Sequence, residues 1–513
     1  MTATPCHILP PGLRAGRRQP PAVTATLAAA LAGLMLSACS TPAPPALTPS
    51  APLATSYLNE PPAAAAAAGS DEDWWNGFQD ATLANLIQQA LARNQDVAMA
   101  LQRVRQARAA ADAQAARLWP SVGVQAAASR SHSGLPEPVK QGLPDTLALR
   151  AAVEVAWEVD LAGGVRAARD AAQADAAAAS AGVQGARLLV ASEVARLYFV
   201  LRGAEQRLRI VQALARAQRQ TASGVASRWR EGQASAFDLD LANAEADALD
   251  AQVPALRLLA GTTQTQLAVL LGRSPSAPVV DADPAHVWPA ANAVAAGQPS
   301  ELLRRRPDLV AAEARVSAES LRSAEARAQW WPKLFLNALL GQQDLRLNAL
   351  NLAPVPFSQV AVALAAPVFN AGRIEAGLQS QSARADEALL AWQKAVLVAV
   401  QEVEDSLLVR AQWAERHAAL ALGTRQRARA LQRAEALQRE GQIDRLALLD
   451  VQRGWLASEL ALSDSHLQRA LAEVQLYKAL GGGFERTPTD AHRVGMAPVP
   501  AAEPTSITPR TPL

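Results

Sequence analysis

The chain has 513 residues, of which half are hydrophobic, and a formal net charge of +2 at pH 7. Its basic residues are interspersed with acidic ones and form no basic stripe, which argues against nucleic-acid binding. Aromatic residues make up only 4% of the chain, whereas alanine is abundant throughout, and small side chains of this kind favour close packing of helix on helix.

The N-terminal segment, 1–38, has the organisation of a lipoprotein signal peptide. Three arginines precede an apolar run, AVTATLAAALAGLML, and the tetrapeptide LSAC follows at Leu36–Cys39. This order is typical of secretory signals, and LSAC resembles the lipobox whose cysteine becomes the lipidated first residue. Cys6, the only other cysteine, lies inside the signal, so no disulfide is expected. We therefore expect lipidation at Cys39; the alternative is an ordinary signal peptide with an incidental cysteine. Ser40, which is not aspartate, favours sorting to the outer membrane.

Residues 39–72 are rich in proline, alanine and serine, a composition that predicts a flexible tether behind the lipid anchor. Beyond them no apolar run reaches the roughly 18 residues that a membrane-spanning helix needs. Any membrane crossing would therefore have to use β-strands.

In residues 73–272 a helix is predicted over Asp96–Leu118, where the Trp-Pro pair at 119–120 ends it. Two strand-like segments follow, SVGVQAAASR and LALRAAVEVAWEVDL. In the second, the valines and tryptophan between 153 and 159 face one way, while Glu154, Glu158 and Asp160 face the other. This period of two predicts a strand with one apolar and one polar face.

A very long helix is predicted next, because residues 164–229 contain no proline. About 65 helical residues extend for about 100 Å. The tetrapeptide REGQ at Arg230–Gln233 then precedes a returning helix that ends near Gly272, with a kink or break expected at Pro254. Helices of this length with few aromatic residues indicate coiled-coil-like packing.

The second half repeats this order. REGQ recurs at Arg439–Gln442, and QLAVLLG at 266–272 matches QLYKALG at 475–481 with the same offset. RNQDV at 93–97 and Trp-Pro at 119–120 share a second, slightly larger offset with RRPDL at 305–309 and Trp-Pro at 331–332. Four markers in one order indicate an internal duplication. The predicted organisation is a first repeat at 73–272, a linker at 273–298, a second repeat at 299–483 and a disordered, Pro/Thr-rich tail at 484–513.

The second repeat is expected to contain a helix over Asp308–Trp330, the strands KLFLNALLG and SQVAVALAAPVFN, and a proline-free helix over Arg373–Arg439. About four amphipathic strands per chain are too few to close a membrane-spanning barrel, since known barrels begin at eight. If the strands cross a membrane, several chains must share one barrel, and three chains would supply twelve strands. Glu154 and Glu158 would then face a watery lumen. The alternative is a soluble α+β protein with two small hairpins.

Four segments resemble those of the TolC-like outer-membrane efflux proteins, in their RND-type lipoprotein (NodT) branch: DWWNGFQDATLANLIQQALARNQDV, WEVDLAGGVRAA, LLRRRPDLVAAEARV and APVFNAGRIEAG. The resemblance extends from Asp73 to Gly481. It implies a mainly α fold with β: a homotrimer with a shared 12-stranded transmembrane β-barrel, a long periplasmic α-helical barrel and an equatorial belt to which 273–298 contributes.

The resemblance also implies a function and a location. The trimer would be the exit duct of a tripartite pump in the outer membrane, lipid-anchored, crossing it with several strands and extending into the periplasm. It would conduct small toxic compounds or drugs passively, with a periplasmic adaptor and an energy-supplying inner-membrane RND-type transporter as partners.

No motif for catalysis is present in the sequence. There is no GxxxxGK[ST] phosphate loop and no nucleophile elbow, and the six histidines lack metal-ligand spacing. We therefore predict no enzymatic activity, no catalytic residue, no cofactor and no metal.

The two REGQ turns reverse the long helices at the end farthest from the strands, with Gly232 and Gly441 as the turn glycines. The resemblance places the periplasmic aperture here. Aligning Gly441 with the family's turn glycine puts Asp450 at an aperture carboxylate, while the other expected acidic position falls on Ala447. A ring of three Asp450 carboxylates would favour cations.

Three further tip residues are candidates for holding the aperture closed. Asp238 falls on a position linked to contacts between the tips, and Asp444 and Arg445 are candidates for salt links. The alternative for the aspartates is structural, because Asp in the first turns of a helix offsets the helix dipole.

Two other functions remain compatible with the sequence. One is an exit duct for polypeptides in type I secretion, on the same fold. The other is a periplasmic coiled-coil lipoprotein without a pore.

Overall fold

The computed structural model describes residues 48–50, 52–60, 73–132, 134, 136, 146–283, 286–289, 296–347, 350–351 and 353–482. The predicted signal peptide, Cys39 and the predicted tail lie outside these residues. The chain divides into two compact units, one containing Gln114–Arg169 and Leu321–Gln379, the other 48–113, 170–320 and 380–482. Each unit takes residues from both halves of the chain, so the compact units do not coincide with the sequence repeats.

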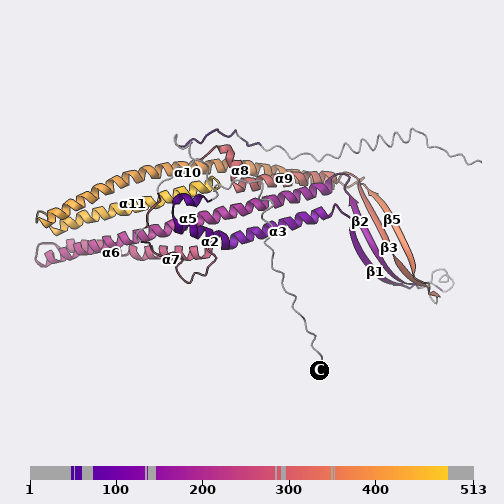
Figure 1. Ribbon diagram of the computed structural model, residues 1–513, viewed down its shortest axis with the longest axis horizontal. Helices are drawn as coiled ribbons and strands as arrows, with labels where there is room; N and C mark the ends of the chain where they lie inside the picture. The colour runs from indigo at the N-terminus through magenta and orange to yellow at the C-terminus, as the bar shows by residue number, and fades with distance from the viewer. Residues whose placement is uncertain are drawn as a thin grey trace, which may run out of the picture. The chain divides into compact units, whose positions relative to one another are not determined.

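The first unit contains one antiparallel sheet, in which the four long strands lie side by side in the order β1, β2, β3, β5 (Figure 1). Its strands are β1 (Ser121–Ser131), β2 (Thr146–Val159), β3 (Lys333–Leu347), the two-residue β4 (Leu350–Asn351) and β5 (Val355–Ala365). All four predicted strands are present. β3 runs beyond the predicted segment, whereas β5 stops at Ala365, since Pro367 has no N–H to donate to a neighbouring strand.

The sheet has one apolar and one polar face, as the alternation in β2 predicts. Val122, Val155, Ala338 and Val360 stand in one row across the four strands. This face is uncovered in the chain, because 82% of Val124 and 80% of Val360 is exposed. Such an extended exposed apolar surface marks a contact with another protein or with lipid.

The helices occupy most of the remaining described chain. They are the 3₁₀ helices η2 (Trp74–Phe78) and η3 (Pro299–Glu301) and the α-helices α2 (Ala81–Arg93), α3 (Gln95–Ala116), α5 (Gly164–Arg230), α6 (Ala236–Asp250), α7 (Gln252–Leu270), α8 (Leu302–Arg305), α9 (Pro307–Ala328), α10 (Arg373–Arg439) and α11 (Arg445–Ala479). In the described part of the chain, none of them is both long and apolar enough to span a membrane.

The two long helices match the prediction, since α5 and α10 have 67 residues each. The returning helices differ from one another. α11 is continuous, whereas the first return is split at Ala251 into α6 and α7. Pro254 falls in the first turn of α7, where its missing N–H has no acceptor within the helix. The predicted break near Pro254 is therefore confirmed.

In each half of the chain, a side chain just before one helix bonds to a carbonyl at the end of another helix, and we call this contact the joint. Asn94 Nδ2 donates to the carbonyl of Leu270, 3.0 Å away, at the end of α7. In the second half, Arg306 Nη1 donates to the carbonyl of Ala479, 3.1 Å away, at the end of α11. The side chain just before α3 or α9 thus satisfies a carbonyl that the returning helix leaves unpaired.

The linker packs on the helices of the second unit. Trp288 donates its indole N–H to Gln206 of α5 at 2.7 Å, and its ring stacks on His466 of α11 with centroids 5.7 Å apart. His466 in turn meets His417 of α10 at a centroid distance of 4.5 Å. One tryptophan from the linker therefore contacts both halves of the chain.

Part of the predicted flexible tether is held in place. Tyr57 is only 4% exposed and belongs to the core formed with α10 and the end of α11. Next to it, the Glu404 carboxylate accepts hydrogen bonds from the backbone N–H of Leu58 at 2.7 Å and from Asn59 Nδ2 at 2.8 Å. The expectation of a loose segment over 39–72 is therefore wrong at Tyr57–Asn59, because a buried aromatic ring and a carboxylate fix the chain there.

Candidate functional site

The two REGQ turns have nearly the same backbone. Gly232 has φ +72° and Gly441 has φ +75°, in the left-handed region that favours glycine. In the first turn the N–H of Gln233 donates to the carbonyl of Arg228 at 2.7 Å, and in the second that of Gln442 donates to Leu437 at 2.9 Å. This bond across six residues, with glycine in the left-handed region, is the Schellman motif that ends helices. The two turns join α5 to α6 and α10 to α11 (Figure 1).

Asp238 starts a helix. Its backbone N–H donates to the hydroxyl of Ser235 at 3.1 Å, and its carboxylate accepts the backbone N–H of Ser235 at 3.0 Å, forming a capping box at α6. The Ser235 hydroxyl, which donates to the Asp238 carboxylate at 2.7 Å, and then the Ser235 backbone N–H lower the pKa of the Asp238 carboxyl. Within the chain, Asp238 therefore has the structural role that was the alternative to a tip contact.

Asp444 both caps a helix and joins the tips. Its carboxylate accepts the backbone N–H of Ala447 at 2.8 Å, which starts α11, and it forms an ion pair with Arg228 at the end of α5. The hydrogen bond from the Ala447 backbone lowers the pKa of the Asp444 carboxyl most, and the contact with Arg228 lowers it further. The predicted salt link at Asp444 thus exists within one chain, with Arg228 as its partner. Arg445 is exposed as the first residue of α11.

Asp450 is exposed, with 74% of its side chain accessible, but its charge has a partner on the same helix. Arg453 Nη2 contacts its carboxylate at 2.6 Å. Arg453 also reaches Gln218 of α5 at 2.6 Å and Glu245 of α6 at 3.2 Å. Gln218 is only 1% exposed and donates to Glu245 at 2.8 Å. Asp450 therefore belongs to a network that links α11 to α5 and α6.

Four residues of these contacts were not predicted from the sequence: Arg228, Arg453, Gln218 and Glu245. The i,i+3 spacing of Asp450 and Arg453 could have revealed their pair, since such residues are neighbours on a helix. Nothing in the sequence points to Gln218, which meets Arg453 across 235 residues.

The polar face of the sheet carries Glu154 and Glu158, as predicted. Glu154 accepts a hydrogen bond from Gln125 of β1 at 3.4 Å, and Glu158 pairs with Lys333 of β3 at 2.8 Å. Asp160 departs from the prediction: it lies beyond the end of β2 and accepts the backbone N–H of Val165 at 3.2 Å and of Arg166 at 2.9 Å at the start of α5.

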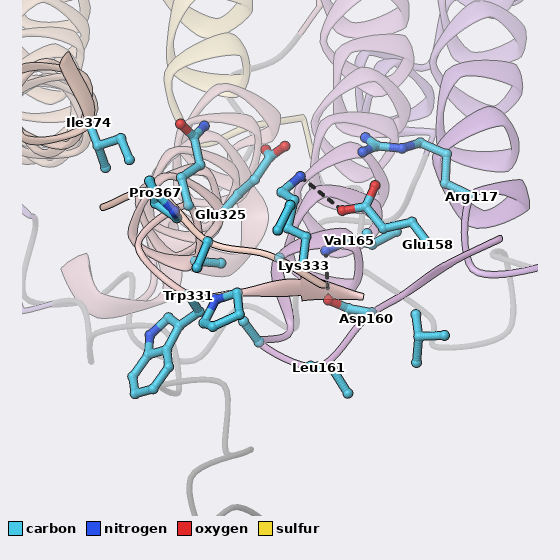
Figure 2. A pocket seen from close by; sticks show the side chains of 18 of the residues that line it. Arg117, Glu158, Asp160, Leu161, Val165, Glu325, Trp331, Lys333, Pro367 and Ile374 are labelled. Carbon is cyan, nitrogen blue, oxygen red and sulfur yellow. Dashed lines mark hydrogen bonds and ion pairs between the residues drawn. The ribbon is translucent and has the colours of Figure 1, made fainter. Parts of the chain in front are cut away.

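A cavity of about 470 Å³ lies beside these residues within the first unit. Figure 2 shows the Glu158 and Lys333 side chains pointing toward one another, with Arg117 near Glu158, and Glu325 also lines the cavity. Charges of both signs line this cavity. Among the described residues no three His, Cys, Asp or Glu side chains group so as to hold a metal ion.

Known proteins similar to this chain are outer-membrane efflux proteins. The pyoverdine export outer membrane protein OpmQ of Pseudomonas putida is 33% identical over 88% of this chain and 96% of its own length. The outer membrane protein OprJ of Pseudomonas aeruginosa is 29% identical over 90% and 96%. The solved outer-membrane channel OprN superposes with a TM-score of 0.75 at 29% identity, over 86% of this chain and 99% of that one.

The family described as "outer membrane efflux protein" matches residues 86–273 and 298–482, which is most of the chain and falls in both halves. The resemblance expected from the sequence is thereby confirmed, together with the location in the outer membrane and the role as the outer-membrane channel of an efflux system. The chain belongs to the outer membrane efflux protein family.

Proposed function

We propose that three copies of this chain form the exit duct of a tripartite efflux pump. The duct conducts small compounds from the periplasm to the exterior and has no enzymatic activity of its own. A periplasmic adaptor and an inner-membrane transporter supply the compounds and the energy. OpmQ is named for the export of pyoverdine and not for the secretion of proteins, which favours small molecules over polypeptides as cargo.

The two-faced sheet is the observation that carries this proposal. Every second residue of β2 from Leu147 to Val159 is apolar and on one face. Thirteen residues extend for about 40 Å, which at a tilt near 45° covers about 28 Å, close to the roughly 25 Å apolar band of membrane-spanning sheets. The apolar face thus has the height needed to meet lipid.

The edges of the sheet require further copies. β1 pairs only with β2 and β5 only with β3 among the described strands, and both edge strands have 11 residues. Unpaired backbone groups are not tolerated in lipid. An edge of one copy therefore pairs with the opposite edge of the next, and three copies close a sheet of twelve long strands around the polar face.

The helix tips form the periplasmic aperture in this proposal. Asp450 is exposed near the second turn, and three copies place three carboxylates there. Arg453 offsets part of this charge. Cys39 anchors each copy to lipid, and Tyr57–Asn59, a short way further along the chain, are fixed on α10.

The test is electrical. Purified full-length protein in planar lipid bilayers should give discrete single-channel conductance and should migrate as heat-resistant trimers on gels. Asp450→Asn should lower the preference for cations, whereas Arg453→Gln should raise it, because Asp450 then loses its counter-ion. The absence of any conductance would refute the duct, and equal shifts in both variants would refute the aperture role of Asp450.

A further inference from the structure

Arg150 lies on the polar face of the sheet, in a strand with a neighbour on either side. It is in β2, paired with Ala127 of β1 and Gln343 of β3, and it shares its face with Glu154 and Glu158 because all three positions are even-numbered in one strand. In the duct proposed above this face borders the lumen. The inference below therefore rests on that proposed function.

A contact across β3 holds the Arg150 guanidinium in place. Its central carbon lies 4.4 Å from the centre of the Phe357 ring of β5. Phe357 is paired with Gly341 of β3, and Gly341 is paired with Ala152, two residues along β2 from Arg150. The guanidinium therefore reaches Phe357 diagonally across β3, over a position that has no side chain.

Gly341 is required by this packing. A Cβ atom built there would lie only 2.3 Å from the carbonyl oxygen of Ala151. The close approach of β2 and β3 leaves room for glycine alone, and this keeps the path between Arg150 and Phe357 open. A cation over an aromatic face gains electrostatic attraction from the ring without losing its charge.

Among the described residues, no carboxylate neutralises the charge of Arg150. Glu158 on the same face pairs with Lys333 at 2.8 Å, and Glu154 accepts a hydrogen bond from Gln125. By contrast, Arg150 forms no ion pair among the described residues, and its buried Nε has no hydrogen-bond acceptor. Among the described residues of this face, Arg150 is thus a cation held in place without a carboxylate partner.

Arg150 and Glu154 act at separate levels. Four residues of strand separate them by about 13 Å, more than the Debye length of about 8 Å at physiological salt. A guanidinium presents parallel N–H donors that match the oxygens of carboxylate, sulfonate or phosphate groups.

We infer that Arg150 is a specificity-determining residue of the duct: three copies form a cationic ring that favours the passage of organic anions through the membrane-spanning part. Phe357 and Gly341 position the guanidinium and do not contact the anion. At the level of Arg150 the selectivity is thus opposite in sign to that of the Asp450 aperture.

The experiment measures reversal potentials of single channels in a KCl gradient, and block by pyrenetetrasulfonate added from the side of the sheet. Arg150→Gln should lower the chloride-to-potassium permeability ratio about threefold and abolish the block. Arg150→Lys should keep the ratio but weaken the block, because it retains the charge and loses the paired donors. Glu154→Gln, the matched control on the same face, should raise the ratio and keep the block.

The outcomes separate the inference from the function on which it rests. A wild-type protein without channels refutes the duct itself. Normal channels in which Arg150→Gln leaves both the ratio and the block unchanged refute the role of Arg150 alone. If Arg150→Gln fails to assemble, Phe357→Leu gives the second measurement, because it keeps the charge but frees the guanidinium. Block of Phe357→Leu equal to that of the wild type would overturn the positioning role of Phe357. Block of Arg150→Lys equal to that of the wild type would overturn the contact between the guanidinium and the oxyanion.

Discussion

Replacing Arg306 by methionine should open the joint between α9 and α11. Arg306 is 9% exposed and lies just before α9. Its guanidinium donates to Asp308 at 2.8 and 3.0 Å, to Glu402 of α10 at 2.6 Å and to the carbonyl of Ala479 at 3.1 Å. Burial opposes the charged form, but the contacts to Asp308 and Glu402 outweigh it, so the pKa of Arg306 remains above its ordinary value.

The size of the effect follows from what methionine leaves behind. Removing one partner of a fully buried ion pair costs about 3–5 kcal/mol. Here the Asp308 and Glu402 side chains are 55% and 43% exposed, so water solvates them once Arg306 is gone. The carbonyl of Ala479 loses its donor, at about 1–3 kcal/mol. We expect a loss of about 2–3 kcal/mol in the free energy of local opening.

Hydrogen exchange measures this loss where it occurs. Amides between Leu476 and Gly482, at the end of α11, should exchange about 30- to 140-fold faster, since each 1.4 kcal/mol is a factor of ten. Arg306→Asn introduces the residue that occupies the equivalent position 94. It should recover part of the protection, because Asn94 makes the corresponding carbonyl bond in the first half.

Arg196→Met is the matched control. Arg196 pairs with Glu193, which occupies in α5 the place that Glu402 has in α10, and the two side chains are 47% and 43% exposed. An exposed pair of this kind contributes less than about 1 kcal/mol. Unchanged exchange at Leu476–Gly482 in Arg306→Met, or equal acceleration in Arg196→Met, would show that the buried joint does not stabilise the end of α11.

Two further predictions concern pH and backbone strain. Burial beside Trp288, together with the nearby His417 and Arg469, lowers the pKa of His466 to about 4. An ordinary imidazole has a pKa near 6.5, so the unfolded chain binds the proton at a higher pH than the folded chain. The free energy of unfolding therefore falls as the pH drops from about 6.5 toward 4. His466→Gln should remove about 1–2 kcal/mol of that loss, measured as the difference between urea unfolding at pH 7 and at pH 5. Gly441→Ala should lower the free energy of unfolding by about 1 kcal/mol, because φ is +75° there although nothing crowds the new methyl group. Gly423→Ala, inside α10 and equally uncrowded, should raise the free energy of unfolding by up to about 1 kcal/mol. A fall in both variants would contradict the argument from backbone strain.

The long elements could be predicted from the sequence because their signals are local. The absence of proline over 67 residues predicts α5 and α10, and the glycine that follows each helix, Gly232 or Gly441, predicts the turn. The alternation in β2 predicts its two faces. Where the alternation weakens, the prediction weakens too: GQQDLRL after Leu340 places polar residues on both faces, so the outer part of β3 was missed.

Contacts between distant residues could not be predicted. Arg453 meets Gln218 across 235 residues, and Arg150 meets Phe357 only because β3 pairs with both β2 and β5 in one register. The tether prediction was wrong at Tyr57–Asn59 for the same reason, since Glu404 lies 345 residues further along the chain than Asn59. In each case the deciding partner belongs to another element, and local composition contains no information on it.

Polar links along α5 and α11 fix how these two helices pair. Starting at the tip, Arg228 pairs with Asp444, Gln218 with Arg453 and Arg207 with Asp464. Successive links are about ten residues apart on either helix, or about 15 Å, so the two helices run antiparallel in one fixed register. The outermost link is exposed and contributes little, whereas the next includes the buried Gln218. If the first link is broken, Gln218–Arg453 and Arg207–Asp464 therefore remain to keep the register of the two helices.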